Sequence, residues 1–370
     1  MEPRDFASPP HGGFALSSAP TQAHRGCEYT LFEAALQVEI RCEGARPVSV
    51  GSPLVETTGE HASSAGAPSV PGTPAAARIG RSVRHLVLGG RRYEVEHRAL
   101  VMGILNRTPD SFYDRGATFA LDALVRRAEK LVGEGADLLD VGGVKAGPGP
   151  EVGEAEELER VVPAIEAITA RFDVPVSVDT WRASVAEASF EAGAVVGNDI
   201  SGFADPAYLG AAVRAGASVV ATHIRLAPRV PDPDPVYVDV VATVAGFLAG
   251  LADRAIGAGV PAESVILDAG LDLGKSAEHS LALLRASNVL AGLGHPLLLS
   301  ASNKTFLGVR LGLDVTERRE ASLAAAAIGV TLGCRILRVH DVAGTVRARD
   351  ALAAVLSERG GEPVPARRAR

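Results

Sequence analysis

Residues 175–199 read PVSVDTWRASVAEASFEAGAVVGND, a stretch that contains one complete strand–helix–strand unit. Residues 175–179 and 194–198 are short, valine-rich runs, typical of strands that are buried on both faces of a parallel sheet. Between them, residues 182–192 carry apolar side chains at helical spacing, and a glycine follows that can end a helix. A helix between two strands lets them run parallel. The stretch therefore predicts an α/β fold with a parallel sheet.

The same alternation continues on both sides of this unit. We predict strands at residues 99–105, 137–141, 175–179, 194–198, 217–222, 264–268, 296–300 and 335–339. Helices are expected at residues 120–133, 154–171, 182–192, 205–215, 237–258, 278–290 and 316–331, with a last helix at 345–358. Regular units in this number favour a closed (β/α)8 TIM barrel, for which about 250 residues are typical. The alternative is a doubly wound open sheet.

Composition divides the chain near residue 80. Residues 1–80 are rich in Ser, Pro, Gly and Ala, which bury too little apolar surface to offset the entropy of ordering, so we expect a mostly disordered extension. An apolar segment at 29–40 interrupts it and is compatible with a local helix or a strand. Residues 83–95, with Gly89-Gly90 at the centre, predict a β-hairpin that closes the bottom of the barrel. We assign the barrel to 81–360 and a frayed tail to 361–370.

Charge and composition exclude several classes of protein. The net charge of -7 leaves no basic footprint for nucleic acid. Residues 1–14 contain no apolar core of a signal peptide, and we find no uncharged apolar run of 18 residues that could span a membrane. The three cysteines, Cys27, Cys42 and Cys334, have no metal-ligand spacing and are an odd number, which argues against a secreted disulfide framework. We therefore expect a cytoplasmic protein.

Nearly every predicted strand ends in a polar residue. These residues are Asn106, Asp140, Asp179, Asn198, Asp199, His223, Asp268, Ser300, Arg338 and His340, and Lys304 follows closely after the seventh strand. In a barrel of this kind the carboxyl ends of the strands meet at one rim, where active sites lie. A single Asp after a strand can instead cap the next helix. That alternative stays open for Asp179, although Thr180 and Asp199 are the better cap candidates.

The residue types at this rim indicate a ligand. Asp179, Asn198, Asp268 and Lys304 suit a flat heterocycle with an aminopyrimidinone edge, because a carboxylate facing a guanidine-like edge makes a bidentate contact. On the other side, Asn106, Arg338 and His340 suit an anion such as a diphosphate, since Arg binds phosphate oxygens bidentately. Mg²⁺ commonly joins such a site through few protein ligands, for which Asn106 is the candidate.

These residues lie in motifs that resemble the dihydropteroate synthases. The motifs, in family order, are MGILNRTPDSF (102–112), DVGG (140–143), SVDT (177–180), GNDI (197–200), DAG (268–270), SNKTF (302–306) and RVHD (338–341). The resemblance covers residues 98–358.

The resemblance implies a transferase of folate biosynthesis that condenses 6-hydroxymethyl-7,8-dihydropterin diphosphate with p-aminobenzoate and releases diphosphate. It implies that Asp179, Asn198, Asp268 and Lys304 hold the pterin, with Lys304 and Asp179 as catalytic residues. It also implies that Asn106, Arg338 and His340 hold diphosphate and Mg²⁺. Loops at 106–118 and 143–153 would close over the site, and a homodimer is expected.

The sequence departs from the family on the p-aminobenzoate side. The second loop has Ala146 and Gly147 where the family usually has Thr and Arg, and Lys145 replaces that Arg only as a flexible point charge. Asn303 stands where another Arg is usual. Asp272 adds a charge after the sixth strand, in a segment (270–276) that resembles the end of a phosphate-binding loop but has one residue too few between its glycines.

Three functions are therefore compared. The first is a working dihydropteroate synthase with an altered second loop. The second is an inactive or repurposed paralogue that keeps the pterin and diphosphate pocket. The third is a folate-binding methyl-transfer domain on the same fold, which the Ser-x-Lys and Arg-x-His pairs at 302–304 and 338–340 disfavour.

Overall fold

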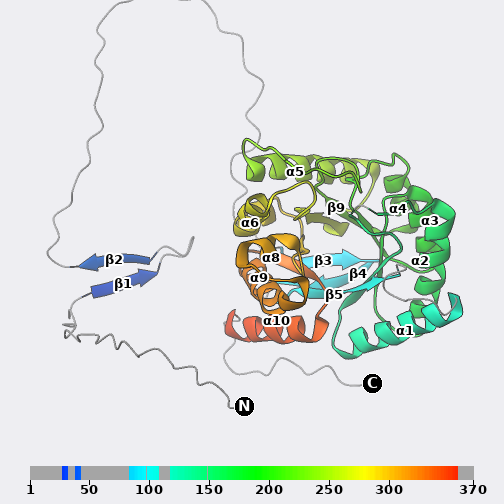
Figure 1. Cartoon of the computed structure of the whole chain (residues 1–370), viewed down its shortest axis with the longest axis horizontal. Coiled ribbons are helices and arrows are strands. Elements are labelled where there is room, and N and C mark those ends of the chain that lie inside the picture. Colours follow the sequence, from blue (N-terminus) through cyan, green and yellow to red (C-terminus); the bar gives the residue numbers. More distant parts are fainter. Residues whose placement is uncertain are drawn as a thin grey trace, which may run out of the picture. The chain divides into compact units, whose positions relative to one another are not determined.

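Figure 1 shows a computed structural model of the chain. It describes residues 83–96, 98–107, 117–147 and 149–356 and the two strands 27–31 and 38–42; side chains are described from residue 83 on, except at 117–120. The chain divides into two compact units, Met1–Pro71 and Gly72–Arg370.

In the first unit, strands β1 (Cys27–Leu31) and β2 (Val38–Cys42) pair antiparallel, with Cys27 opposite Cys42. Of the two alternatives left open for residues 29–40, a helix or a strand, the structure shows strands. The disorder expected for the rest of residues 1–80, and the frayed tail at 361–370, fall outside the described residues.

The second unit is a closed parallel barrel, as predicted. Its strands are β5 (Leu100–Asn106), β6 (Leu138–Gly142), β7 (Val176–Asp179), β8 (Val196–Asp199), β9 (Ser218–Thr222), β10 (Val265–Asp268), β11 (Leu297–Leu299) and β12 (Cys334–Val339). They follow chain order around the barrel, and β12 pairs with β5 to close it. Closure excludes the doubly wound open sheet.

Helices surround the strands (Figure 1). They are α1 (Ala117–Gly133), α2 (Glu154–Thr169), α3 (Ala183–Glu191), α4 (Tyr208–Ala215), α5 (Val240–Ala258), α6 (Ala277–Arg285), α7 (Ser287–Ala291), α8 (Thr305–Leu311), α9 (Arg319–Thr331) and α10 (Val342–Leu356). The helix predicted at 278–290 is two helices, because the chain turns at Ala286 and the Ser287 hydroxyl donates to the carbonyl of Leu284. The short helix α8 was not predicted.

The apolar character of α5 follows from its place in the barrel. Among the described residues it is the one helix long and apolar enough to cross a membrane by length and composition alone. Its buried side chains, which include Val244, Leu248 and Leu251, belong to the core between helices and barrel. It also carries Asp253 and Arg254. The barrel thus accounts for its composition.

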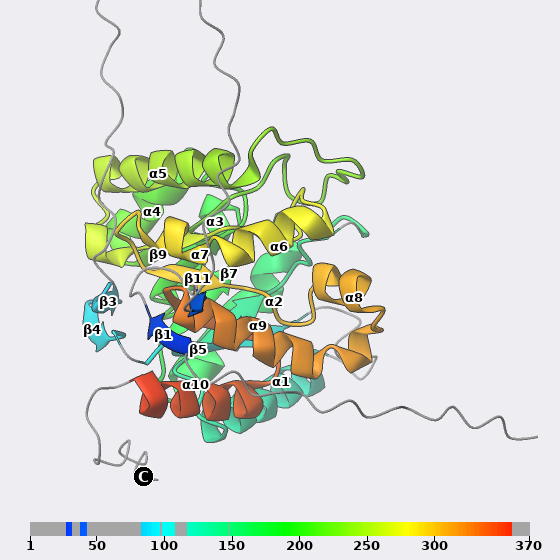
Figure 2. The same ribbon diagram turned by 90° about the vertical axis from the view of Figure 1, so that its left-hand side faces the viewer.

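The predicted hairpin closes the barrel at the amino ends of the strands. Strands β3 (His85–Leu88) and β4 (Arg91–Glu94) are joined by Gly89 and Gly90, both at positive φ, as a tight hairpin turn requires. Leu86 and Leu88 are buried in one cluster with inward side chains of the barrel such as Met102. Figure 2 shows the hairpin at one end of the barrel and α8 at the other. The hairpin therefore forms a floor, and the opposite end is the mouth.

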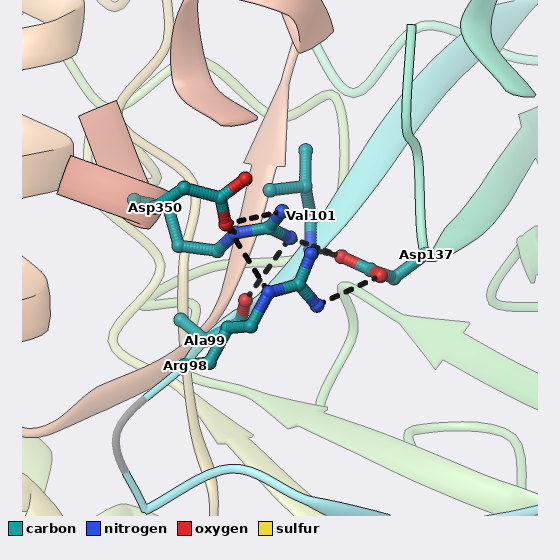
Figure 3. Close-up of polar contacts among 6 residues, drawn as sticks. Arg98, Ala99, Val101, Asp137 and Asp350 are labelled. Atoms are coloured by element: carbon teal, nitrogen blue, oxygen red, sulfur yellow. Dashed lines mark hydrogen bonds and ion pairs between the residues drawn. The ribbon is translucent and has the colours of Figure 1, made fainter. Parts of the chain in front are cut away.

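A buried ion pair lies at the amino ends of the first two barrel strands (Figure 3). The fully buried Arg349 of α10 places Nη1 2.5 Å from Oδ2 of Asp137, which precedes β6. The same carboxylate oxygen accepts the backbone N–H of Val101, and its other oxygen lies 3.4 Å from Nη1 of Arg98. Arg98 also binds Asp350. The network joins the last helix to the first two barrel strands.

Candidate active site

Alternation along the strands directs one polar layer into the mouth. On β7, Val176 and Val178 pack towards the helices, so Ser177 and Asp179 face the barrel axis. The same parity applies to the other strands, whose inner apolar side chains form the cluster above the hairpin. The inward residues at the carboxyl ends are Asn106, Asp140, Asp179, Asn198, Thr222, Asp268, Ser300, Arg338 and His340.

Arg338 joins two of the carboxylates in this layer. Its Nε donates to Oδ2 of Asp140 at 2.6 Å, and its Nη2 donates to Oδ2 of Asp179 at 2.7 Å. The amide of Asn198 lies 3.3 Å from both oxygens of Asp140. No role was predicted for Asp140, although it lies near the end of a predicted strand, as Asp179 does. It orients Arg338 and Asn198 together.

Burial shifts the ionisation of this layer. Burial raises the pKa of Asp179 to about 7, against the lowering effect of Arg338, and neighbouring carboxylates raise it further. Burial also raises the pKa of Asp268, whose Oδ1 accepts the N–H of Gly270. For Arg338, burial lowers the pKa, but Asp140 and Asp179 outweigh it, so the guanidinium stays charged. The mouth therefore contains a permanent cation, Arg338, beside Asp179, a carboxyl that can change protonation near neutral pH.

Lys304 reaches the same layer from outside the strands. It is the N-cap residue of α8, and its Nζ donates to the carbonyl of Leu271 at 2.8 Å. Burial lowers its pKa, while Asp272 and Asp268 raise it. Arg338 and Asp179 also act on it electrostatically. The structure thus brings together all four residues predicted for the heterocycle, Asp179, Asn198, Asp268 and Lys304.

The residues predicted for the anion lie on the neighbouring side. Asn106 is exposed at the end of β5, beside Gly142, where an added Cβ would come 3.4 Å from its Oδ1 and 3.5 Å from Cβ of Asp179. Nδ1 of His340 lies 3.0 Å from the hydroxyl of Ser302. Burial, followed by the cations Arg338 and Lys304, lowers the pKa of His340 to about 4, so its imidazole is neutral at pH 7. A cavity of about 380 Å³ adjoins His340 and Ser302.

His223 does not join this layer, contrary to what its place at a strand end suggested. Its Nδ1 lies 2.8 Å from Nζ of the buried Lys275, which also donates to the carbonyls of Gly270 and Leu273. Burial and Lys275 lower the pKa of His223 to about 3, so the ring is neutral and its Nδ1 can accept a hydrogen bond from Lys275. Lys275 is thus fixed inside the turn that carries Leu271, and the resemblance to a phosphate-binding loop is incidental.

The alternative of helix capping is wrong for all three candidates. Asp179 binds Arg338, and the N-cap of α3 is Arg182. The hydroxyl of Thr180 accepts the N–H of Arg182, and Asp199 accepts those of Ser201 and Phe203, but neither is an N-cap residue. Both stabilise the turns that lead to α3 and α4.

Two departures in sequence have local structural reasons. Asn303 has φ 58°, and Asp272 has φ 64°, a left-handed conformation that Asn and Asp tolerate better than most residues. Oδ2 of Asp272 accepts the first N–H of α8, from Thr305, at 2.6 Å. In the loop at 143–153, which we call loop 2, Ala146 is half-buried and Gly147 is exposed. The residues that differ therefore border the mouth and leave its polar layer intact.

Comparison with known proteins agrees with this geometry. Residues 102–340 match the family model described as pterin binding enzyme. The chain is 44% identical over 270 residues to "Inactive dihydropteroate synthase 2" of Mycobacterium leprae (strain TN), covering 71% of this chain and 92% of that one. It is 41% identical over 246 residues to the dihydropteroate synthase of Haemophilus influenzae, covering 66% and 90%.

A solved structure shares the fold. The dihydropteroate synthase of Xanthomonas albilineans with 4-aminobenzoic acid superposes with a TM-score of 0.69 at 38% identity, covering 74% of this chain and 98% of that one. The family match spans more than half of the chain, and the relatives are covered almost end to end. The chain is therefore a divergent member of the dihydropteroate synthase family of pterin-binding enzymes.

Proposed function

We propose that the chain is a dihydropteroate synthase-type transferase that condenses 6-hydroxymethyl-7,8-dihydropterin diphosphate with p-aminobenzoate. The observation that carries this proposal is the single polar layer in which Arg338 lies between Asp140 and Asp179, with Lys304 and Asp268 in electrostatic reach. The layer offers carboxylates to a guanidine-like edge and cations to an anion. The family assignment supports the choice of ligand.

In this proposal Asp179, Asn198, Asp268 and Lys304 bind the pterin. Carboxylates of Asp179 and Asp268 accept its N–H groups, and Lys304 donates to its ring oxygen. The floor of the barrel is closed by the hairpin, so the ring enters from the mouth. Burial strengthens each of these contacts relative to water.

Asn106, Arg338 and His340 bind the diphosphate. The exposed Asn106 offers an amide oxygen, a ligand that Mg²⁺ accepts, and Mg²⁺ typically keeps several waters and few protein ligands. When bound there, Mg²⁺ would neutralise charge on the diphosphate. Arg338 supplies a permanent cation to the same oxygens, and neutral His340 supplies one hydrogen-bonding nitrogen.

The reaction then needs little covalent work from the chain. The C–O bond to diphosphate breaks with its electron pair leaving on oxygen, the amine nitrogen forms the C–N bond, and the amine proton is lost to solvent. Positive charge that develops on the pterin methylene is stabilised by the carboxylate of Asp179, while Lys304 and Arg338 stabilise the opposite charge. Lys304 and Asp179 are therefore the proposed catalytic residues.

A second function is favoured by the border of the mouth. Ala146, Gly147 and Asn303 lack the side chains that the family usually places towards p-aminobenzoate. The Mycobacterium leprae relative is named as inactive. In this alternative the chain binds the pterin diphosphate and does not transfer it.

Two measurements on purified full-length protein separate these functions. Steady-state formation of dihydropteroate above the uncatalysed background supports the transferase, and its absence overturns it. Calorimetric binding of the dihydropterin diphosphate with Mg²⁺ is expected in both cases. Absence of binding would overturn both.

We also propose a cytoplasmic homodimer. The resemblance supports the dimer, and the apolar side chains of Val309, Leu311 and Ile328 are exposed on α8 and α9, where a partner would cover them. Light scattering of the full chain at micromolar concentration tests this, and a monomer mass would contradict it.

A further inference from the structure

Loop 2 is held to its immediate neighbours by arginine side chains that bind its carbonyls. Nη1 of Arg160, on α2, donates to the carbonyl of Gly143 at 2.7 Å. Nη2 of Arg182, before α3, donates to the carbonyl of Val152 at 2.8 Å. Both contacts tie the ends of loop 2 to elements that follow it closely in the chain.

The middle of loop 2 is held from a distant segment. Nη2 of Arg229 donates to the carbonyls of Gly149 and Pro150 at 2.6 and 2.5 Å. Arg229 belongs to the connection between β9 and α5, and β7 and β8 lie between β6 and β9 in the barrel. This contact therefore joins loops from the carboxyl ends of strands that are not neighbours.

The sequence of loop 2 explains why a side chain from another segment binds its carbonyls. Residues 147–150 read GPGP, and the two prolines have no N–H to donate. The carbonyls of Gly149 and Pro150 remain available as acceptors. An added Cβ at Gly149 would lie 3.5 Å from Nη2 of Arg229, an ordinary van der Waals contact, so the guanidinium packs directly against this part of the loop.

This placement of Arg229 requires an uncommon backbone conformation. Its φ is 68°, an uncommon conformation for a residue with a long side chain. The N–H of Val230 bonds to the carbonyl of Ala227 at 3.2 Å and closes a turn around it. Such strain persists where the surroundings hold it, and it is concentrated at functional positions.

We propose that Arg229 is a positioning residue that clasps loop 2 at Gly149 and Pro150 and so orders the acceptor side of the mouth. It supplies from another loop an anchoring guanidinium where loop 2 itself has Gly147. This inference rests on the proposed function, in which loop 2 borders the bound p-aminobenzoate. Arg229 acts through the loop backbone and not on the reacting atoms.

Hydrogen exchange on the full chain tests the clasp directly. In Arg229→Ala, amides of residues 143–153 should exchange about tenfold faster, because a charged hydrogen bond is worth roughly one such factor. Arg229→Lys keeps a cation and should show a smaller increase. Arg225→Ala is the matched control, because it removes a guanidinium from the same segment and Arg225 binds Asp232 within that segment. It should leave loop 2 unchanged.

Steady-state kinetics measures an effect that a purely structural role of Arg229 would not produce. In Arg229→Ala, KM for p-aminobenzoate should rise about five- to tenfold while kcat changes less than about twofold, the signature of lost ground-state positioning. Binding of the dihydropterin diphosphate should be unchanged. If the wild type shows no turnover, the proposed transferase fails while the exchange experiment still decides the clasp.

Two outcomes would overturn the proposal. One is loop 2 exchange in Arg229→Ala that equals that of the wild type. The other is an increase that extends equally to the barrel strands, which would show general destabilisation. Faster exchange confined to loop 2, with partial restoration by Arg229→Lys, supports it.

Discussion

Asp179 combines burial with a shared cation, since Arg338 also binds Asp140. Its pKa, raised to about 7, means that the folded protein keeps a proton that the unfolded chain, with a carboxyl pKa of 3.8, has already lost. This group therefore lowers the free energy of unfolding as pH rises from about 4 to about 7. The proposed pterin binding requires the ionised form of Asp179, because a guanidine-like edge is bound by an ionised carboxylate.

We expect pterin binding to strengthen as pH rises through about 7, where Asp179 loses its proton. Calorimetry with a hydroxymethylpterin between pH 5.5 and 8.5 measures this. Asp179→Asn should bind weakly with little pH dependence, while Asp205→Asn, in the connection before α4, should behave as the wild type. The same steep profile in Asp179→Asn would contradict the assignment.

Lys304→Met should weaken binding of the dihydropterin diphosphate about ten- to a hundredfold, since a charge-assisted hydrogen bond contributes about 1.5–3 kcal/mol. The substitution keeps most of the length of the side chain and removes its charge. Calorimetry checks it against Lys130→Met, whose side chain is exposed on α1. Affinity equal to that of the wild type would show that Lys304 lies outside the ligand.

At the scale of elements, the hairpin β3–β4 acts as the floor that the inner barrel packs on. Leu86 is fully buried there. Leu86→Ala should lower the free energy of unfolding by about 2–5 kcal/mol, because it removes buried methyl groups and leaves a cavity. Urea denaturation measures this, with the exposed Arg92→Ala on the same hairpin as control. A loss below about 1 kcal/mol would mean that the hairpin detaches without cost.

The elements could be predicted because their signals are local. A few neighbouring residues are enough to indicate the conformation of a valine-rich run such as residues 175–179, or of the Gly89-Gly90 turn. The helix α8 was missed because its seven residues follow a polar motif and end at Gly312, too short for a periodic pattern. The rule that the carboxyl ends of barrel strands meet at one rim also placed Asp179 and Arg338 at the same end of the barrel.

Residues that act through distant contacts could not be predicted in this way. Asp140 gains its role from Arg338, 198 positions later, and Arg229 reaches Pro150 from 79 positions away. Lys275 is buried against His223, although a lysine after a strand normally indicates a surface. Such pairings depend on barrel closure, which periodicity does not specify residue by residue.

At the scale of the whole molecule, the pair Arg349–Asp137 fastens the end of the barrel to its beginning (Figure 3). Arg349→Met should cost about 3–5 kcal/mol of unfolding free energy, because it removes the shorter of the two ion pairs that the buried carboxylate of Asp137 makes. Thermal and urea denaturation test this, with the exposed Arg347→Met as control. Adding Asp137→Asn, which keeps an acceptor for Val101, should recover much of the loss. A double variant as unstable as the single one would contradict the charge argument.

The shared guanidinium of Arg338 has a consequence for how ligands bind together. In the proposed function, a pterin bound to Asp179 would release one edge of the Arg338 guanidinium for the anion, and we therefore expect the two sites to be positively coupled. Thermodynamic linkage requires each ligand to raise the affinity of the other by the same factor, typically about fivefold or more. Calorimetric titration of diphosphate, with and without a hydroxymethylpterin, should show this, and equal affinities would contradict it.

This coupling would affect both the binding of the substrate and the release of the products. While the pterin and the diphosphate are parts of one molecule, binding of each part would strengthen the binding of the other. Once transfer has separated them, departure of either product lets Arg338 return to Asp179 and weakens the hold on the one that remains. The first product to leave thus hastens the second.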